Sequence, residues 1–376
     1  MNGVVRILVP LTLVACSSAS ESARQEAEPR RETALDSVVT IDTVDHPVPE
    51  VVRLDTVLDL QRRRVNIEEN VSLYVAEEGT GPVLVLINGG PGNTLHSFLP
   101  HFSRANSFAT ILYYDQRGTG QSAWNPGAGP YSTSQAVDDL ERLRSALDLD
   151  EWFVLGHSYG GVIAQWYAMR YPHRVRGMIL VGSSVPIDGL DLGERDYRSA
   201  GERARIREAY AIDGQAVVPV HGGAVDLVSL RRMLYNGYLN GDWKRQYFFK
   251  PGRERMAQIA RLEWVHDRDF NVQMRRDGFS RDLREVFLRA PIPTLIIEGA
   301  QDANWGPEKP RLFARHHPLA QLVVLDSAAH YPFSERPAAF FGALSEFMRR
   351  APAVPDDAIE RWIDVITELE NDNATR

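Results

Sequence analysis

The sequence predicts an α/β fold built around a mostly parallel sheet with helices on both faces. Six apolar runs of strand length contain almost no polar residues, as is typical of strands buried on both sides. These runs cover residues 83–87, 109–114, 152–155, 177–181, 294–297 and 321–325. Segments with apolar side chains at helical spacing lie between them, over residues 136–147 and 162–171. Such alternation of strands and helices is the pattern of a doubly wound sheet.

Other segments depart from this alternation. Residues 51–58 and 71–75 alternate loosely in hydrophobicity, which predicts a hairpin ahead of the parallel strands. Residues 186–290 are helical in pattern and rich in arginine and aromatic side chains, so we expect an inserted helical cap over the strand ends. After the last strand, two helices are predicted over residues 338–350 and 356–370.

The composition is that of a globular protein with a sizeable core. Of 376 residues, 44% are hydrophobic and 24% are charged. The formal net charge of −8 provides no basic surface of the kind that binds nucleic acid. No Cys/His spacing typical of a zinc site is present, and neither a metal nor a cofactor is predicted.

The N-terminus has the pattern of an export signal. Met1 and Arg6 precede an apolar stretch over residues 7–15, which is too short to span a bilayer, and then Cys16 follows. The Leu-Val-Ala-Cys sequence resembles the lipobox of bacterial lipoproteins, which implies a lipid on Cys16 and an exported protein anchored to a membrane, at the outer membrane or cell surface. The alternative is a simple secreted protein with an incidental cysteine. Residues 17–35 have few large apolar side chains and are expected to form a tether. The predicted organisation is a signal peptide (1–15), a lipidated N-terminus and tether (16–50), a first core segment (51–185), a helical cap (186–290) and a second core segment with C-terminal helices (291–376).

The strongest chemical signal is Gly-His-Ser-Tyr-Gly over residues 156–160, between a predicted strand and a predicted helix. This is the context that a nucleophile elbow requires, because glycines on both sides of Ser158 make room for a strained strand-to-helix turn. The start of the helix also favours negative charge that develops near Ser158. We therefore expect Ser158 to be the nucleophile.

A serine nucleophile needs a base, and His330 is the best placed histidine. It follows the last core strand, at the sheet edge where ligands bind in open α/β folds. His157 should point away from Ser158, and His316 and His317 are expected to be solvated. A loop histidine that hydrogen-bonds only locally is the alternative for His330.

The histidine in turn needs a carboxylate that holds its orientation. Asp302 follows a core strand, whereas its main rival, Asp326, lies on the same loop as His330. Glu298 lies within or beside a strand and is expected to be structural. The oxyanion of a tetrahedral intermediate needs backbone N–H donors, for which the N–H groups of Tyr159 and Gly90 are the candidates.

Three segments together resemble one family. Residues 88–92 (Asn-Gly-Gly-Pro-Gly), 115–122 (Asp-Gln-Arg-Gly-Thr-Gly-Gln-Ser) and 156–161 resemble the proline iminopeptidase branch of the α/β-hydrolases, from about residue 71 to 337. The order serine, aspartate, histidine is also the order of this fold. The resemblance implies release of N-terminal residues from short peptides, with Ser158 as acyl acceptor, His330 as base and then acid, and Asp302 as the orienting group.

The sequence departs from that family at two places. Asn88 stands where the family usually has histidine, a side chain thought to brace the loop. The cap matches no motif, so the carboxylates that would bind a substrate ammonium are not fixed. The candidate acids are Glu202, Glu208, Glu263 and Asp267, with Glu263 preferred beside Trp264; Trp305 is a further candidate for substrate binding.

Three functions remain open at this point. The first is a lipid-anchored aminopeptidase that acts on small peptides. The second keeps the same three residues but acts as a carboxylesterase or other small-molecule acyl hydrolase, because both reactions pass through an acyl-serine. The third is a non-catalytic ligand-binding protein on a hydrolase scaffold. The oligomeric state is not predicted.

Overall fold

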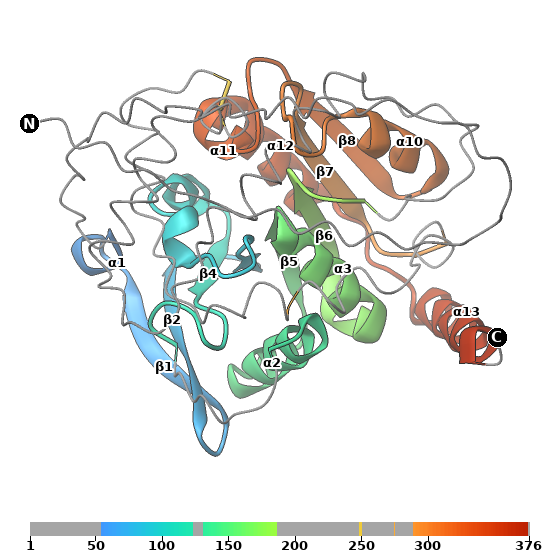
Figure 1. Ribbon diagram of the computed structural model, residues 1–376, viewed down its shortest axis with the longest axis horizontal. Helices are drawn as coiled ribbons and strands as arrows, with labels where there is room; N and C mark the ends of the chain where they lie inside the picture. The colour runs from blue at the N-terminus through green and yellow to red at the C-terminus, as the bar shows by residue number, and fades with distance from the viewer. Residues whose placement is uncertain (1–53, 123–130, 186–247, 250–273, 275–288, 375–376) are drawn as a thin grey trace, which may run out of the picture. The chain divides into compact units, whose positions relative to one another are not determined.

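The computed structural model describes residues 54–122, 131–185, 248–249, 274 and 289–374 (Figure 1). All of them belong to one unit, Thr43–Arg376. The predicted signal peptide, Cys16 and the tether lie outside the described residues, as does nearly all of the predicted cap.

The described residues form an eight-stranded sheet in the order β1-β2-β4-β3-β5-β6-β7-β8 (Figure 1). Strands β1, β2 and β4 pair in antiparallel fashion, and every pair from β4 through β3 to β8 is parallel. The strands are β1 Gln61–Glu68, β2 Val71–Gly79, β3 Val83–Ile87, β4 Thr110–Tyr114, β5 Trp152–His157, β6 Val175–Val181, β7 Thr294–Gly299 and β8 Ala320–Leu325. The predicted fold class is thus confirmed.

The strand order reverses direction at β3. The chain passes from β3 to β4 on one side and then to β5 on the other. The connections that leave β3 and β5 therefore run to opposite sides, which is the topological switch point at whose carboxyl edge open α/β sheets bind ligands.

Helices cover both faces of the sheet because side chains alternate along each strand. Val85 and Ile296 belong to one apolar cluster together with residues of α2, α3 and α10, whereas Leu86 and Ile297 belong to a second cluster with residues of α12. The helices are α1 Leu54–Val57, α2 Thr133–Ala146, α3 Tyr159–Arg170, α10 Glu308–His316, α11 Pro332–Glu335, α12 Pro337–Arg350 and α13 Asp356–Ala374. Short 3₁₀ turns are Leu95–Ser97, His101–Ala105 and Pro172–Arg174.

The N-terminal hairpin differs from its prediction. Residues 54–57 form the short helix α1, and the strand that pairs with β2 is instead β1, which begins Gln-Arg-Arg-Arg. Strand β1 is polar because it lies at the edge of the sheet, where most of its side chains are exposed. Charged side chains on an edge strand also oppose pairing with other chains.

Candidate active site

Ser158 lies in a strained turn between β5 and α3. Its backbone angles are φ 55° and ψ −125°, a region that a residue with a Cβ rarely adopts. A Cβ at Gly156 would collide with the backbone of Gly160, and a Cβ at Gly160 would collide with the carbonyl oxygen of Ile87. The turn thus needs both glycines, and it leaves the side chain of Ser158 partly exposed beside buried neighbours.

Asp302 and His330 meet at the same edge of the sheet. Asp302 follows β7, His330 follows β8, and the distance from His330 Nδ1 to Asp302 Oδ2 is 2.8 Å. Asp302 Oδ1 accepts a second hydrogen bond from the Asn304 N–H at 2.8 Å. Burial by itself would raise the pKa of Asp302, but the charge and hydrogen bond of His330, with a further bond from the Asn304 N–H, hold it below its ordinary value. Asp302 is therefore ionised and orients the imidazole.

Gly182 directly follows β6 and packs against this pair. A Cβ there would lie 3.2 Å from His330 Nδ1 and 3.4 Å from Asp302 Oδ2, and the φ of Gly182 is +49°. Both the space and the backbone angle require glycine. Strands β7 and β8, which run parallel to β5, thus bring the aspartate and the histidine to the edge at which Ser158 stands.

His157 connects the serine turn to the histidine loop. Its Nε2 lies 2.8 Å from the backbone oxygen of His330, and the two imidazole centroids are 4.8 Å apart. Burial, and then the nearby His330, lower the pKa of His157 to about 3. His157 is therefore neutral, donates its Nε2–H to that carbonyl and holds the His330 backbone beside Ser158.

The loop after β3 packs against Ser158. A Cβ on Gly89 would lie 2.8 Å from the Ser158 Cβ and 3.3 Å from the Tyr159 nitrogen. Gly90 follows with a φ of +107°, which glycine adopts without strain. The two expected oxyanion donors thus come from segments that the fold brings together, and their role stays a prediction.

Asn88 braces this loop, as expected for the side chain at that position. Its Nδ2 donates to the Tyr114 carbonyl at 2.8 Å, and its Oδ1 accepts from Ser97 Oγ at 2.7 Å. The Asn88 carbonyl in turn accepts from Gln116 Nε2 at 2.9 Å. Asp115 holds the loop from the other side, because it accepts from the Leu95 N–H at 2.9 Å. These contacts show that the 115–122 segment supports the β3 loop.

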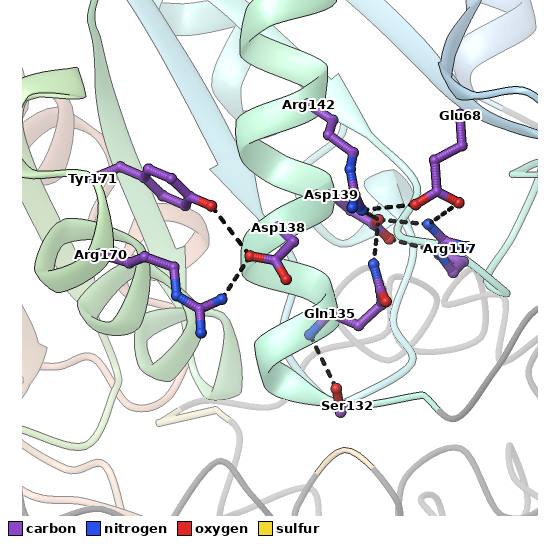
Figure 2. A network of polar contacts seen from close by, with 9 residues as sticks. All are labelled: Glu68, Arg117, Ser132, Gln135, Asp138, Asp139, Arg142, Arg170 and Tyr171. Carbon is purple, nitrogen blue, oxygen red and sulfur yellow. Dashed lines mark hydrogen bonds and ion pairs between the residues drawn. The ribbon is translucent and has the colours of Figure 1, made fainter.

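Arg117 anchors the same segment to the scaffold (Figure 2). Its guanidinium makes two hydrogen bonds with Asp139 of α2, at 2.7 and 2.6 Å, and an ion pair with Glu68 of β1 at 3.1 Å. Arg142 contacts both of these carboxylates, and Gln135 donates to Asp139 at 2.9 Å. Figure 2 also shows Asp138, on the other side of α2, bonded to Arg170 and Tyr171 at the end of α3. The network joins β1, α2 and the loop that carries Gln116.

Glu335 supports the histidine loop and was not found by sequence reasoning. Its two oxygens accept from the Ala329 N–H at 2.7 Å and from the Phe249 N–H at 2.8 Å. Phe248 stacks on Tyr331, with ring centroids 5.2 Å apart. The described part of the predicted cap therefore touches Tyr331, directly after His330, and Glu335, which bonds to the residue before it. A glutamate on a short helix carries no sequence signal for this role.

The other predicted residues fall into three groups. Glu202, Glu208, Glu263, Trp264 and Asp267 lie outside the described residues, and Trp305 is half-buried on the loop after Asp302. Asp326 is exposed and bonds to Gln301, away from His330. His316 is exposed as expected, but the expectation for His317 was wrong: it is 3% exposed and accepts from the Leu319 N–H. Helix α10 turns its ring inward against Phe313. Among the residues that the structure describes, no group of His, Cys, Asp and Glu is arranged to hold a metal ion.

Comparison with known proteins agrees with this architecture. A family model described as alpha/beta hydrolase fold matches residues 82–337. The chain is 25% identical to a proline iminopeptidase of Heyndrickxia coagulans over 279 residues, 72% of this chain and 92% of the relative. It is 28% identical to a 2-hydroxymuconate semialdehyde hydrolase of Pseudomonas sp. (strain CF600) over 301 residues, 76% of this chain and 94% of the relative. A solved esterase of Exiguobacterium antarcticum superposes with a TM-score of 0.58 at 20% identity, over 77% of this chain and 100% of the esterase.

Because the family model spans residues 82–337, which is most of the chain, the chain belongs to the α/β-hydrolase fold family.

Proposed function

We propose that this chain is a serine hydrolase in which Ser158, His330 and Asp302 carry out acyl transfer. One observation carries the proposal: the buried Asp302–His330 pair lies at the sheet edge where the strained turn presents Ser158. A serine becomes nucleophilic when an adjacent imidazole removes its proton, and an ionised carboxylate keeps that imidazole in the required tautomer.

The geometry supports a two-step reaction. Ser158 Oγ attacks the substrate carbonyl carbon while its proton passes to His330, and the N–H groups of Tyr159 and Gly90 stabilise the oxyanion. His330 then returns the proton to the leaving amine or alcohol, and an acyl-serine remains. Water, deprotonated by His330, attacks this acyl group and releases the acid. Asp302 stays ionised and stabilises the imidazolium in both steps.

The substrate class that we favour is a short peptide with a free N-terminus, as in an aminopeptidase of the proline iminopeptidase type. The 88–92 and 115–122 segments support it, as does the similarity to a protein named proline iminopeptidase across most of both chains. A second candidate, an esterase or other small-molecule acyl hydrolase, is favoured by the similarity to a 2-hydroxymuconate semialdehyde hydrolase.

A panel of chromogenic substrates separates the two candidates. We expect turnover of proline or other aminoacyl amides, and we expect N-acetylation of those substrates to abolish it. Turnover of esters without any amide turnover would favour the second candidate. Failure of a fluorophosphonate probe to label Ser158 would instead point to a non-catalytic ligand-binding protein.

We also propose that the N-terminus anchors the enzyme to a bacterial membrane through a lipid on Cys16. The sequence pattern around this residue supports the proposal. Within the part of the chain that the structure describes, no helix has the length and apolar character needed to span a bilayer. Incorporation of an alkynyl fatty acid that Cys16→Ser abolishes is the expected result; equal labelling of both proteins would contradict it.

A further inference from the structure

Glu298 is a fully buried acid that the proposed reaction does not use. It lies near the end of β7, four residues before Asp302, and its exposed fraction is 0%. Neither of its carboxyl oxygens meets a hydrogen-bond donor among the residues that the structure describes. An ionised carboxylate is costly to bury without donors, so this side chain needs a different explanation.

The groups around Glu298 leave its charge uncompensated. Alternation along β7 directs its side chain to the same face as Ile296, which belongs to an apolar cluster. The acidic neighbour is Asp302, which is paired with His330. Two further titratable groups pack around this pair: His157 of β5, which touches His330, and Glu335 of α11, which bonds to the Ala329 N–H.

The two acids respond to this environment in opposite ways. Burial, and then the charge of Asp302, raise the pKa of Glu298 well above its ordinary value. The pKa of Asp302 is held low by His330 and Asn304 against the effect of burial. Two adjacent carboxyl groups cannot both ionise easily, so the proton stays on the acid that has no cation beside it. A protonated Glu298 carries an O–H donor, and Asp302 is an acceptor.

We propose that Glu298 is a positioning residue that remains protonated and donates a hydrogen bond to the Asp302 carboxylate. Asp302 would then be held by three donors, from His330, Asn304 and Glu298, which fix the carboxylate toward the imidazole. This bond also draws charge from the Asp302 carboxylate. The inference rests on the proposed function, because it assigns Glu298 a role through Asp302.

The test follows the ionisation of His330 without any knowledge of the substrate. The rate at which a fluorophosphonate labels Ser158 is measured against pH for the wild type, Glu298→Gln and Glu298→Leu. Glu298→Gln keeps a donor at the same place, so the midpoint of the acid limb should remain within about 0.3 pH units. Glu298→Leu removes the donor at similar volume and leaves Asp302 less compensated, so the midpoint should rise by about 0.5–1 unit. Thr294→Val, at the other end of the same strand, is the matched control for packing damage and should not move it.

The possible outcomes are distinct. If Glu298 were ionised, Glu298→Gln would remove a negative charge and lower the midpoint by about a unit or more, which would overturn the proposal. Equal midpoints in all variants would show a purely structural role. Absence of labelling in the wild type would instead refute the proposed nucleophile. Should Glu298→Leu not fold, Glu298→Gln still decides between a neutral and an ionised acid.

A spectroscopic measurement provides an independent readout. The proton between His330 and Asp302 should give a far-downfield ¹H NMR resonance that His330→Ala removes. Glu298→Gln should leave this resonance close to its wild-type position, and Glu298→Leu should shift it, because the acceptor strength of Asp302 changes. An unshifted resonance in Glu298→Leu would contradict the hydrogen bond.

Discussion

Replacing Arg117 alone, which leaves its buried partner Asp139 in place, should destabilise the protein more than replacing both residues together. Asp139 is only 3% exposed, and after Arg117→Met its remaining partners are Gln135 and the half-exposed Arg142. Loss of one partner from a buried ion pair costs about 3–5 kcal/mol, and the remaining contacts of Asp139 reduce this to about 2–4 kcal/mol. In Arg117→Met/Asp139→Leu no buried charge is stranded, and the loss should be at most about 1–2 kcal/mol.

Urea unfolding of the two single variants, the double variant and the wild type measures this as a double-mutant cycle. A second readout is fluorophosphonate labelling of Ser158, which should slow in Arg117→Met because Gln116 then holds the Asn88 carbonyl less firmly. Arg170→Met is the control, since its ion pair with Asp138 is half-exposed and should contribute less than about 1 kcal/mol. A double variant that is as unstable as the sum of the singles would refute the reasoning.

Three further predictions concern the serine turn, Gly182 and the two buried histidines His157 and His317. Ser158→Ala should abolish probe labelling while the urea midpoint stays close to that of the wild type, because alanine keeps the Cβ in the same turn and loses only the hydroxyl; residual labelling would mean that another nucleophile reacts. Gly182→Ala should slow labelling by about 10–100-fold, because its Cβ crowds His330 and strains the backbone; an unchanged rate would show that the pair shifts freely. Stability should fall as the pH drops below about 6.5, because burial lowers the pKa of His157 to about 3 and of His317 to about 4. Below that pH the unfolded chain binds a proton at each of these two histidines, whereas the folded chain keeps both neutral. The free energy of unfolding should therefore fall by about 1.4 kcal/mol per pH unit for each histidine until its folded pKa is reached. Replacement of His317 by glutamine should halve this slope, as measured by urea unfolding at a series of pH values.

The buried part of the fold was readable from the sequence because burial on both faces leaves an uninterrupted apolar run. Strands β3 to β7 carry that pattern, and the edge strand β8 has an apolar run although most of its side chains are half-buried; each was predicted close to its observed position. Strand β1 was missed for the opposite reason: an edge strand keeps its hydrogen bonds on one side only and exposes polar side chains. Only the pairing with β2 makes the run Gln-Arg-Arg-Arg a strand, and nothing in the run itself indicates one.

The residues predicted to act stand at the ends of strands, where chain position alone specifies them. Ser158, Asp302 and His330 each follow a recognisable apolar run. Glu335 was missed because its role depends on which backbone N–H groups the tertiary fold brings within reach. The side chain of His317 was misjudged because the sequence does not show which way the end of α10 faces.

The pairing of β6 with β7 has a consequence for how enzymes of this design diversify. Met178 and Thr294 are directly opposite in the sheet, although more than a hundred residues separate them along the chain. Because the two strands are parallel, a segment inserted between them leaves at the carboxyl end of β6 and returns to the amino end of β7, and the sheet holds both points in place. Doubling the length of such a segment adds only about 0.6 kcal/mol of closure entropy. Selection can therefore vary the length of this segment between lineages while the sheet, and the strand ends that carry Ser158, Asp302 and His330, are inherited intact.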